Sequence, residues 1–470
     1  MSTNILITIK LPNRPGKLAQ ILTIISDEGG SLGAIDLVSA SPTHTTRQLM
    51  VRLYDQGKLD ELVHILKNMP DVEVVSIIDR VFNSHLGGKI EVNSKRVINN
   101  WEDLSIVYTP GVAKVSQAIA NDPYRAYNLT MKGNTVAIVT DGSAILGLGN
   151  LGPEAALPVM EGKAALFKQF ANVDAIPLCV NVHDTEQIIA VAAACAPVFG
   201  GINLEDIAAP KCFEIEDKLS KMLDIPVFHD DQHGTAVVTL AGLINALKVV
   251  GKGLTNIKVV LSGAGAAGVA ITKILIGAGV KNIIVCDRNG AITKSRPNLS
   301  SIKVWIAENT NHHGLQGNLT EVIKDADVFI GVSAPGLLTK QDVANMAEKP
   351  IVFALANPEP EVKPEEIQDI CAVIATGRSD FPNQINNALA FPGIFRGALD
   401  CHARKINNEM CIAAAHALAG TIKENELSAE NIIPSVFNEG VVPAVAKAVV
   451  TAAEQTGVCM KFSQEAVGII

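Results

Sequence analysis

The sequence predicts an α/β fold in which a small N-terminal module precedes two larger layered domains. The chain has 470 residues, of which 48% are apolar and only 4% aromatic. This length and composition give room for two or three domains whose helices pack closely on sheets. Strand-like and helix-like apolar patterns alternate along the chain, and a glycine-rich turn follows a short apolar run. We expect domains at residues 1–80, 81–234 and 235–470.

The first 80 residues show a β-α-β-β-α-β order. Residues 5–11 alternate as a strand does, and Pro12–Gly16 interrupt the alternation. Two helices are predicted from apolar residues at helical spacing: Leu18, Ile21, Leu22 and Ile25, then Leu59, Leu62, Val63 and Leu66. Further strand-like stretches lie at residues 34–39, 48–53 and 72–78. This order predicts a ferredoxin-like module, an antiparallel sheet with both helices on one face.

The pattern weakens over residues 85–101, as expected of a connection between domains. The second domain has strand-like stretches at residues 135–140 and 176–182. The third begins near Thr235 and contains the apolar run Ile257–Leu261, a glycine-rich turn that opens a helix, and a second strand at Asn282–Cys286. This arrangement predicts a Rossmann-type βαβ unit.

The glycine-rich turn of that unit is a candidate dinucleotide site. Its glycines allow the backbone to approach a pyrophosphate at the positive end of a helix, whereas a bare tight turn is the alternative. An acid stands 24 residues after the first glycine and can accept hydrogen bonds from a ribose diol. Arg288 beside it could pair with a 2′-phosphate, so both NAD and NADP stay open. The cofactor-binding candidates are Gly263, Gly265, Ala266, Ala267, Gly268 and Asp287.

A second candidate site consists of Glu205 and Asp206 with the more distant Asp231. Apolar residues flank these acids, which indicates partial burial, and buried carboxylates need compensation. Mg²⁺ or Mn²⁺ would provide it, since both ions prefer oxygen ligands. A solvated acidic loop is the alternative. His229 and His233 are alternative ligands that would shift the preference toward zinc, and we expect them instead to support the ligands or to pack.

Two single residues are candidates for proton transfer. Lys163 follows Gly162 at an expected helix start, where burial and a nearby cation would help it lose its proton and act as a general base. Tyr108 precedes a Pro-Gly turn, and its phenol can donate a proton to a carbanion. From residue type alone, a solvated lysine and a packed tyrosine are the alternatives.

The stretch PNRPGKLAQI, followed by a Gly-Gly turn, resembles an ACT domain. This family of regulatory modules binds amino acids, usually between paired copies. The resemblance implies an effector near Asn13 and Gly16, where the turn would hold it. The alternative is a ferredoxin-like dimerisation domain without a ligand, because fold does not determine function.

The rest of the chain resembles the small bacterial-type malic enzymes, which convert malate to pyruvate and CO₂. The motifs are YTPGVA, DGSAILGLGNLGP, ALPVMEGKAALFK, GGINLEDI, PVFHDDQHGTA, FALANPEPE and NQINNALAFPGIFRGALD. The resemblance implies that Tyr108 is the general acid and Lys163 the general base. The implied metal ligands are Glu205, Asp206 and Asp231.

The same resemblance assigns supporting residues and an assembly. Asp230 would orient Lys163, and Asn357 and Asn387 would contact malate and the nicotinamide end of NAD or NADP. The family implies a homodimer, and an ACT-like module would add a second pairing surface. One departure is clear: the arginine that clamps malate in the larger animal-type members has no counterpart motif in this sequence.

Composition excludes several other classes of function. The net charge is −9 and no basic stretch stands out, so we expect no nucleic-acid partner. The longest apolar tract, Val259–Val280, holds five glycines and a lysine, and we expect no membrane span. Eight scattered cysteines and a start without a secretory signal predict a cytoplasmic protein. An amino-acid dehydrogenase and an inactive amino-acid sensor are the remaining alternatives, although neither gives the acidic cluster a task.

Overall fold

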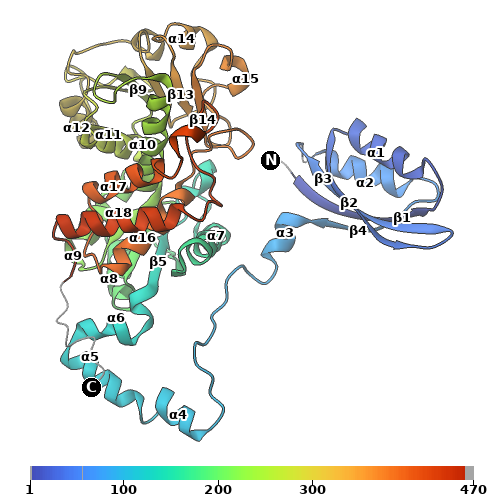
Figure 1. Cartoon of the computed structure of the whole chain (residues 1–470), viewed down its shortest axis with the longest axis horizontal. Helices are drawn as coiled ribbons and strands as arrows, with labels where there is room; N and C mark the ends of the chain where they lie inside the picture. The colour runs from blue at the N-terminus through green and yellow to red at the C-terminus, as the bar shows by residue number, and fades with distance from the viewer. Residues whose placement is uncertain (1–2, 56, 461–470) are drawn as a thin grey trace. The chain divides into compact units, whose positions relative to one another are not determined.

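The computed structural model describes residues 3–55 and 57–460 and divides into two compact units, Met1–Val92 and Asn93–Ile470 (Figure 1). The first unit holds one antiparallel sheet with the strand order β2-β3-β1-β4. Its elements are β1 (Thr3–Pro12), α1 (Lys17–Asp27), β2 (Gly30–Ala40), β3 (His44–Leu53), α2 (Lys58–Lys67), β4 (Glu73–Asp79) and α3 (Arg80–His85).

The core of the first unit follows from the alternation in β1. Ile5, Ile7 and Ile9 are fully buried against Ile21 of α1 and Leu62 of α2. Both helices therefore cover the same face of the sheet (Figure 1). The predicted β-α-β-β-α-β order and the one-sided packing are confirmed.

The second unit begins with a connection and three short helices. Residues 86–100 form no helix or strand, as predicted. The helices that follow are α4 (Trp101–Val107), α5 (Val112–Asn121) and α6 (Ala126–Leu129), and none of them buries a residue. Trp101 is 85% exposed and Ile106 is 66% exposed. This segment consequently carries apolar side chains that the chain itself leaves uncovered.

A four-stranded parallel sheet with the order β6-β5-β7-β8 follows. Every residue of β5 and β7 is buried, as expected of central strands covered on both faces. The elements are β5 (Thr135–Thr140), α7 (Pro153–Ala171), β6 (Asp174–Cys179), α8 (Thr185–Cys195), β7 (Gly201–Leu204), α9 (Lys211–Met222) and β8 (Val227–His229).

Helix α10 (Asp230–Val250) begins directly after β8 and leads to the second sheet. It is long and apolar enough to cross a membrane, yet 72% of its most apolar window is buried within the protein. Because most of this apolar surface is buried within the protein, we interpret α10 as a core helix. The domain boundary expected between residues 234 and 235 falls inside this helix.

The second sheet has the order β11-β10-β9-β12-β13-β14, with β11 alone antiparallel to its neighbour. Its strands are β9 (Lys258–Ser262), β10 (Asn282–Asp287), β11 (Gly290–Ala291), β12 (Val328–Gly331), β13 (Ile351–Ala354) and β14 (Val373–Thr376). Its helices are α11 (Ala266–Gly277), α12 (Ser301–Asn309), α13 (Leu319–Val322), α14 (Lys340–Ala344), α15 (Pro364–Ile367), α16 (Phe391–Asp400), α17 (Asn408–Ala419) and α18 (Val441–Gln455). The strand order reverses between β9 and β12, which is the predicted Rossmann-type arrangement.

Candidate active site

Four carboxylates lie at the carboxyl ends of two neighbouring strands. Glu205 and Asp206 follow β7, and Asp230 and Asp231 follow β8 as the first residues of α10. Because β7 and β8 are paired in parallel, their carboxyl ends open on the same edge of the sheet, where α/β folds bind ligands. The sheet thereby brings together acids that are distant in the sequence.

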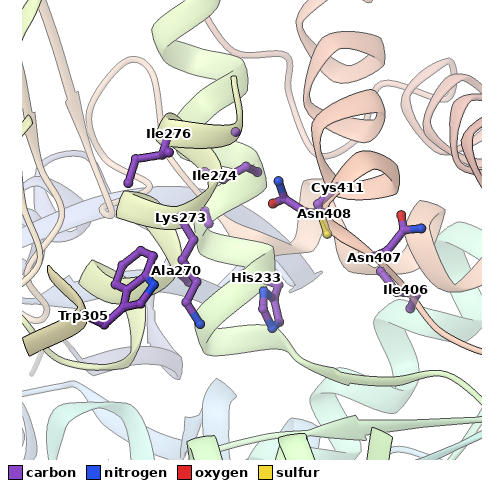
Figure 2. A pocket seen from close by; sticks show the side chains of 12 residues that line it. His233, Ala270, Lys273, Ile274, Ile276, Trp305, Ile406, Asn407, Asn408 and Cys411 are labelled. Atoms are coloured by element: carbon purple, nitrogen blue, oxygen red, sulfur yellow. The ribbon is translucent and has the colours of Figure 1, made fainter. Parts of the chain in front are cut away.

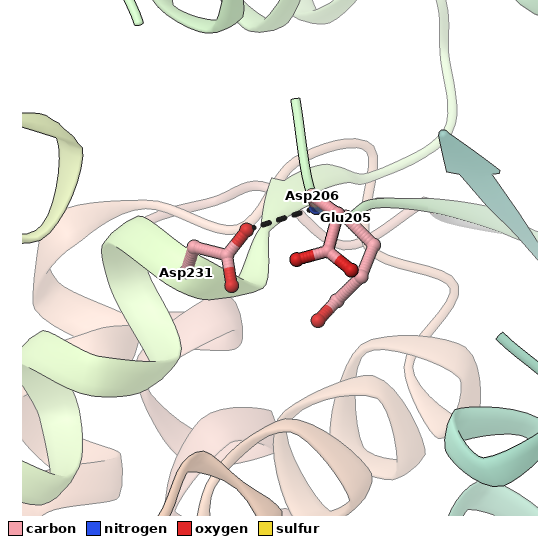
Figure 3. Close-up of side chains that lie close together, drawn as sticks. All are labelled: Glu205, Asp206 and Asp231. Carbon is pink, nitrogen blue, oxygen red and sulfur yellow. Dashed lines mark hydrogen bonds between the residues drawn. The ribbon is translucent and has the colours of Figure 1, made fainter. Parts of the chain in front are cut away.

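Three of these acids form a compact cluster (Figure 3). One carboxylate oxygen from each of Glu205, Asp206 and Asp231 lies within 4.8 Å of the other two. The backbone N–H of Asp206 donates a hydrogen bond to Asp231 Oδ2 at 3.0 Å. Asp206 also has a φ of 52°, a left-handed conformation that non-glycine residues adopt only where the surroundings hold them. The fold therefore keeps the two aspartates together.

The chemistry of this cluster fits a hard divalent cation. Asp206 Oδ2 is buried without a hydrogen-bond partner among the residues that the structure describes. Burial, together with the Asp231 and Glu205 carboxylates, raises the pKa of Asp206 to about 8, because a further negative charge is unfavourable there. Mg²⁺ or Mn²⁺ would compensate these charges through the oxygen ligands that both ions prefer.

The two histidines near the cluster do not join it. His229 Nδ1 lies 3.9 Å from Asp231 Oδ2, and His233 Nε2 lies 2.9 Å from a carboxylate oxygen of Glu216. Within the described part of the chain, the group of possible metal ligands at this site contains only carboxylates. An all-oxygen donor set favours Mg²⁺ or Mn²⁺ over zinc.

Lys163 is buried beside the acids, with only 7% of its surface exposed. Its Nζ lies 2.9 Å from Glu205 Oε1 and 2.5 Å from Asp230 Oδ2. The ammonium also lies 4.3 Å from the centroid of the Phe391 ring. The structure thus brings together Lys163 and Asp230, the residue expected to orient it.

One expectation about Lys163 was wrong, and a second, which depends on a bound cation, stays a prediction. The residue does not stand at a helix start, because α7 already begins at Pro153 and Lys163 lies near its middle. Burial does act to lower the pKa of Lys163, but the Asp230 and Glu205 carboxylates outweigh it and raise that pKa. In the absence of a cation, the two carboxylates stabilise the ammonium more strongly than burial destabilises it.

Sequence reasoning missed Glu216, a nearly buried carboxylate on α9. It accepts hydrogen bonds from the His229 backbone N–H at 2.9 Å, from Gln232 Nε2 at 3.3 Å, and from the His233 ring at 2.9 Å. Glu216 therefore ties down the turn that carries Asp230 and Asp231. The sequence does contain a pattern that could have identified Glu216. It stands at helical spacing from the apolar residues Cys212 and Leu219, and this spacing predicts a buried acid that needs hydrogen-bond partners.

A second missed group fixes the loop that carries Asp206. Ser143 Oγ donates to Asp141 Oδ1 at 2.6 Å and accepts the backbone N–H of Ala208 at 2.9 Å. Lys211 forms an ion pair with the fully buried Asp141. These contacts join the loop after β5 to the loop after β7. They therefore help to fix the loop that carries Asp206.

The two asparagines expected at the substrate lie in loops of the second sheet. Asn387 begins a short 3-10 turn. This turn lies close to Gly234 of α10, since a Cβ added to Gly234 would lie 3.2 Å from Asn387 Cβ and 1.9 Å from Asp230 Oδ1. Asn387 therefore lies against the first turn of α10. Asn357 follows β13, and its carbonyl oxygen would lie 3.1 Å from an added Cβ at Gly147. This contact places Asn357 next to the DGSAILGLGNLGP loop.

Tyr108 is not part of the acidic cluster in the single chain. It ends α4 and is 67% exposed. In the described chain, no hydrogen bond or ring contact involves its phenol. The reason is local: α4 has no buried residue and packs against no core.

The glycine-rich turn has the geometry of a dinucleotide site. Gly263 has a φ of 121°, and a Cβ there would lie 2.7 Å from the Val332 carbonyl oxygen. A Cβ at Gly268 would lie 1.9 Å from the carbonyl oxygen of Gly263, whereas Gly265 has open space beside it. The first and third glycines thus permit a tight turn and close packing, and the second leaves room for a pyrophosphate at the start of α11.

Asp287 ends β10 at the position of the expected ribose-binding acid. Its carboxylate accepts two hydrogen bonds of 3.0 Å from Arg296 and one of 2.6 Å from Lys303. Burial opposes ionisation, but these bonds hold the pKa of Asp287 at about 2. Two cations therefore flank the acid that the sequence predicts for ribose binding.

Comparison with known protein families matches three consecutive parts of the chain. Residues 2–76 match the ACT domain, residues 87–220 the malic enzyme N-terminal domain, and residues 232–454 the malic enzyme NAD binding domain. The two malic enzyme matches together cover most of the chain. Both resemblances noted in the sequence are confirmed.

Individual relatives agree with the family matches. The chain is 57% identical over 458 residues to the NAD-dependent malic enzyme of Geobacillus stearothermophilus, covering 97% of this chain and 96% of that one. It is 58% identical over 373 residues to the bifunctional malic/malolactic enzyme of Bacillus subtilis, covering 79% and 91%. The crystal structure of the Pyrococcus horikoshii malic enzyme matches with a TM-score of 0.77 at 50% identity, covering 80% and 89%. The chain belongs to the malic enzyme family and carries an ACT domain at its N-terminus.

Proposed function

We propose that the chain oxidatively decarboxylates L-malate to pyruvate and CO₂ with NAD or NADP as the oxidant. The observation that carries the proposal is the buried Lys163, which lies within hydrogen-bond distance of Glu205 and Asp230 at the edge of the acidic cluster. A buried amine beside carboxylates of metal-binding geometry suits proton abstraction from a hydroxyl group held there.

The residues have separate tasks in this proposal. Glu205, Asp206 and Asp231 would hold Mg²⁺ or Mn²⁺. When bound, the cation supplies a Lewis acid for the C2 oxygen and the dinucleotide supplies a hydride acceptor. Lys163 Nζ takes the proton of the C2 hydroxyl group. Engagement of Glu205 by the cation would remove one of the two carboxylates that raise the pKa of Lys163, so the free amine would become accessible.

Tyr108 is the proposed acid that protonates the terminal carbon after CO₂ has left. Because Tyr108 is exposed in the single chain, we infer that the chain forms a dimer in which Tyr108 of one copy completes the active site of the other. The exposed apolar residues Trp101 and Ile106 lie on the same helix. A second copy that covered them would bury apolar surface and at the same time fix the phenol.

The ACT domain is proposed to bind a small amino-acid effector near Asn13 and Gly16. Gly16 precedes α1 with a φ of 85°, and no side chain caps that helix. The side chain of Asn13 donates to the Ser41 carbonyl oxygen at 2.9 Å, which holds the turn in place. The uncapped N–H groups of α1 suit a carboxylate.

An absorbance assay with L-malate, Mn²⁺ and either NAD⁺ or NADP⁺ tests the proposed reaction. Lys163→Ala is expected to lose about 10²–10⁴-fold in turnover while it still binds the dinucleotide. Lys168→Ala is the matched control, because Lys168 lies on the same helix and bonds only surface groups, Asn172 and Asp174. A Lys163→Ala chain that folds and turns over malate at nearly the parental rate would contradict the assignment.

A further inference from the structure

A cavity of about 390 Å³ lies among α10, α11, α12 and the start of α17 (Figure 2). It is separate from the acidic cluster and from the glycine-rich turn, since it contains no residue of either. This volume is sufficient for a small organic molecule. The lining residues used below are His233, Lys273, Ile274, Trp305, Ile406 and Asn408.

The cavity contains a cation without a carboxylate partner. Lys273 Nζ lies over the Trp305 ring, 5.5 Å from the ring centroid, and forms no ion pair within residues 3–55 and 57–460. Figure 2 shows the Lys273 chain extending between Trp305 and His233. Lys273 is exposed, so an anion at the cavity would meet a solvated ammonium that forms no ion pair with a carboxylate of the described chain.

An amide in the cavity is also available. Asn408 points toward the space between α11 and α17 (Figure 2), and its side chain has no hydrogen-bond partner elsewhere in the described chain. Its neighbour Asn407 differs, because its side chain already caps α17 through the Met410 N–H and donates to Thr456. Of the two asparagines, Asn408 is the one free to bind a ligand.

The remaining wall is apolar. Ile274 and Ile406 line the cavity together with the Trp305 ring. One cation and one amide suit a single carboxylate, whereas the aliphatic and aromatic walls suit an apolar body. We propose that this cavity is a binding site for a small monocarboxylate with an apolar or aromatic body, with Lys273 and Asn408 holding the carboxylate.

The cavity is connected to the acidic cluster through His233. This ring forms part of the wall and is hydrogen-bonded to Glu216, which also holds the His229 backbone N–H. The occupant would contact α10 at His233, two residues or ~3 Å along the helix axis from Asp231. An occupied cavity would therefore shift the Mn²⁺ concentration required for activity. This consequence rests on the proposed function, but binding itself does not.

Tryptophan fluorescence tests the binding directly. The chain has two tryptophans, so Trp101→Phe leaves Trp305 as the only reporter, inside the cavity wall. Titration of the full chain with sodium 3-phenylpropionate is expected to change the Trp305 emission with saturation in the millimolar range. Lys273→Gln should weaken binding about tenfold, as should use of the neutral 3-phenylpropanamide. Lys281→Gln, an exposed lysine outside the cavity, is the matched control.

Two outcomes would overturn the proposal. One is an affinity that Lys273→Gln and the amide probe leave unchanged, because the cation would then have no part in binding. The other is competitive displacement of the probe by malate with Mn²⁺, which would locate it in the acidic cluster. The activity test uses the parental chain, which has both tryptophans. If the probe binds with saturation but does not change the Mn²⁺ concentration that this chain requires, the binding site is retained and only its link to Glu216 is refuted.

Discussion

Subunit complementation tests whether Tyr108 and Lys163 act from different copies of the chain. Tyr108 is 67% exposed and Lys163 only 7% exposed, so the two groups lie in separate surroundings within one copy. The perturbation consists of Tyr108→Phe in one preparation and Lys163→Ala in another. Each homodimer is expected to be nearly inactive, because every site lacks either the acid or the base.

The expected recovery follows from the geometry. Random exchange of equal amounts makes about half of the dimers mixed. If a site combines Tyr108 of one copy with Lys163 of the other, each mixed dimer has one intact site and one doubly altered site. The mixture should therefore regain about a quarter of the parental turnover per site. If both residues act from the same copy, neither site of a mixed dimer is intact.

The assay is NADH or NADPH formation from L-malate with Mn²⁺, after the two chains have been unfolded and refolded together. A mixture of Tyr108→Phe with parental chain is the control for refolding, because it should regain about half of the parental turnover whether or not the chains exchange. Mass spectrometry of differently tagged chains measures the mixed fraction. Activity that stays at the level of the separate variants, in a sample with mixed dimers, would refute supply of Tyr108 across the dimer.

Four further changes have expected outcomes. EDTA should abolish turnover and added Mn²⁺ should restore it, and Asp231→Asn should need more Mn²⁺ for half-maximal rate; turnover in EDTA would contradict the metal role. Asp287→Ser should release Arg296 and Lys303 for a 2′-phosphate and thus lower the KM for NADP⁺ relative to NAD⁺; an unchanged ratio would contradict this. Because the pKa of Asp287 is held at about 2, its stabilisation of about 1–2 kcal/mol is present above about pH 4 and lost as the pH falls toward 2. Denaturant unfolding of the parental chain should show that loss, and Asp287→Ser should not. Gly234→Ala should lower turnover strongly, because its Cβ would lie 1.9 Å from Asp230 Oδ1; a fully active variant would show that the turn can shift without cost.

Local patterns predicted most of the fold. The alternation in residues 5–11 determines which face of β1 is buried, since side chains along a strand alternate between the two faces of its sheet. The glycine spacing predicted the turn before α11, because only glycine permits the close approach to the Val332 and Gly263 carbonyl oxygens. Both patterns, the alternation and the glycine spacing, lie within short stretches of the sequence, although the Val332 carbonyl oxygen that the turn approaches does not.

The predictions failed where a sequence pattern was interpreted wrongly or where a contact joins residues that are far apart in the sequence. Gly162 suggested a helix start, but Gly152 and Pro153 form the true one, with proline at the first helical position. Glu216 acts through partners 13 to 17 residues away, which only the assembled sheet defines. Tyr108 follows α4, which buries no residue, so the contacts proposed for its phenol in a second copy could not be predicted from a pattern within one chain.

Helix α10 has a mechanical consequence. Its first two residues are aspartates, its 21 residues span about 30 Å, and it packs against α11 and α17 of the nucleotide-binding part. Asp230 is itself the first residue of the helix, so no flexible loop separates it from the rest of α10. A rotation of the nucleotide-binding sheet would therefore be transmitted through the rigid helix to both aspartates. Closure of the nucleotide-binding part on the first sheet would then change the spacing of the carboxylates.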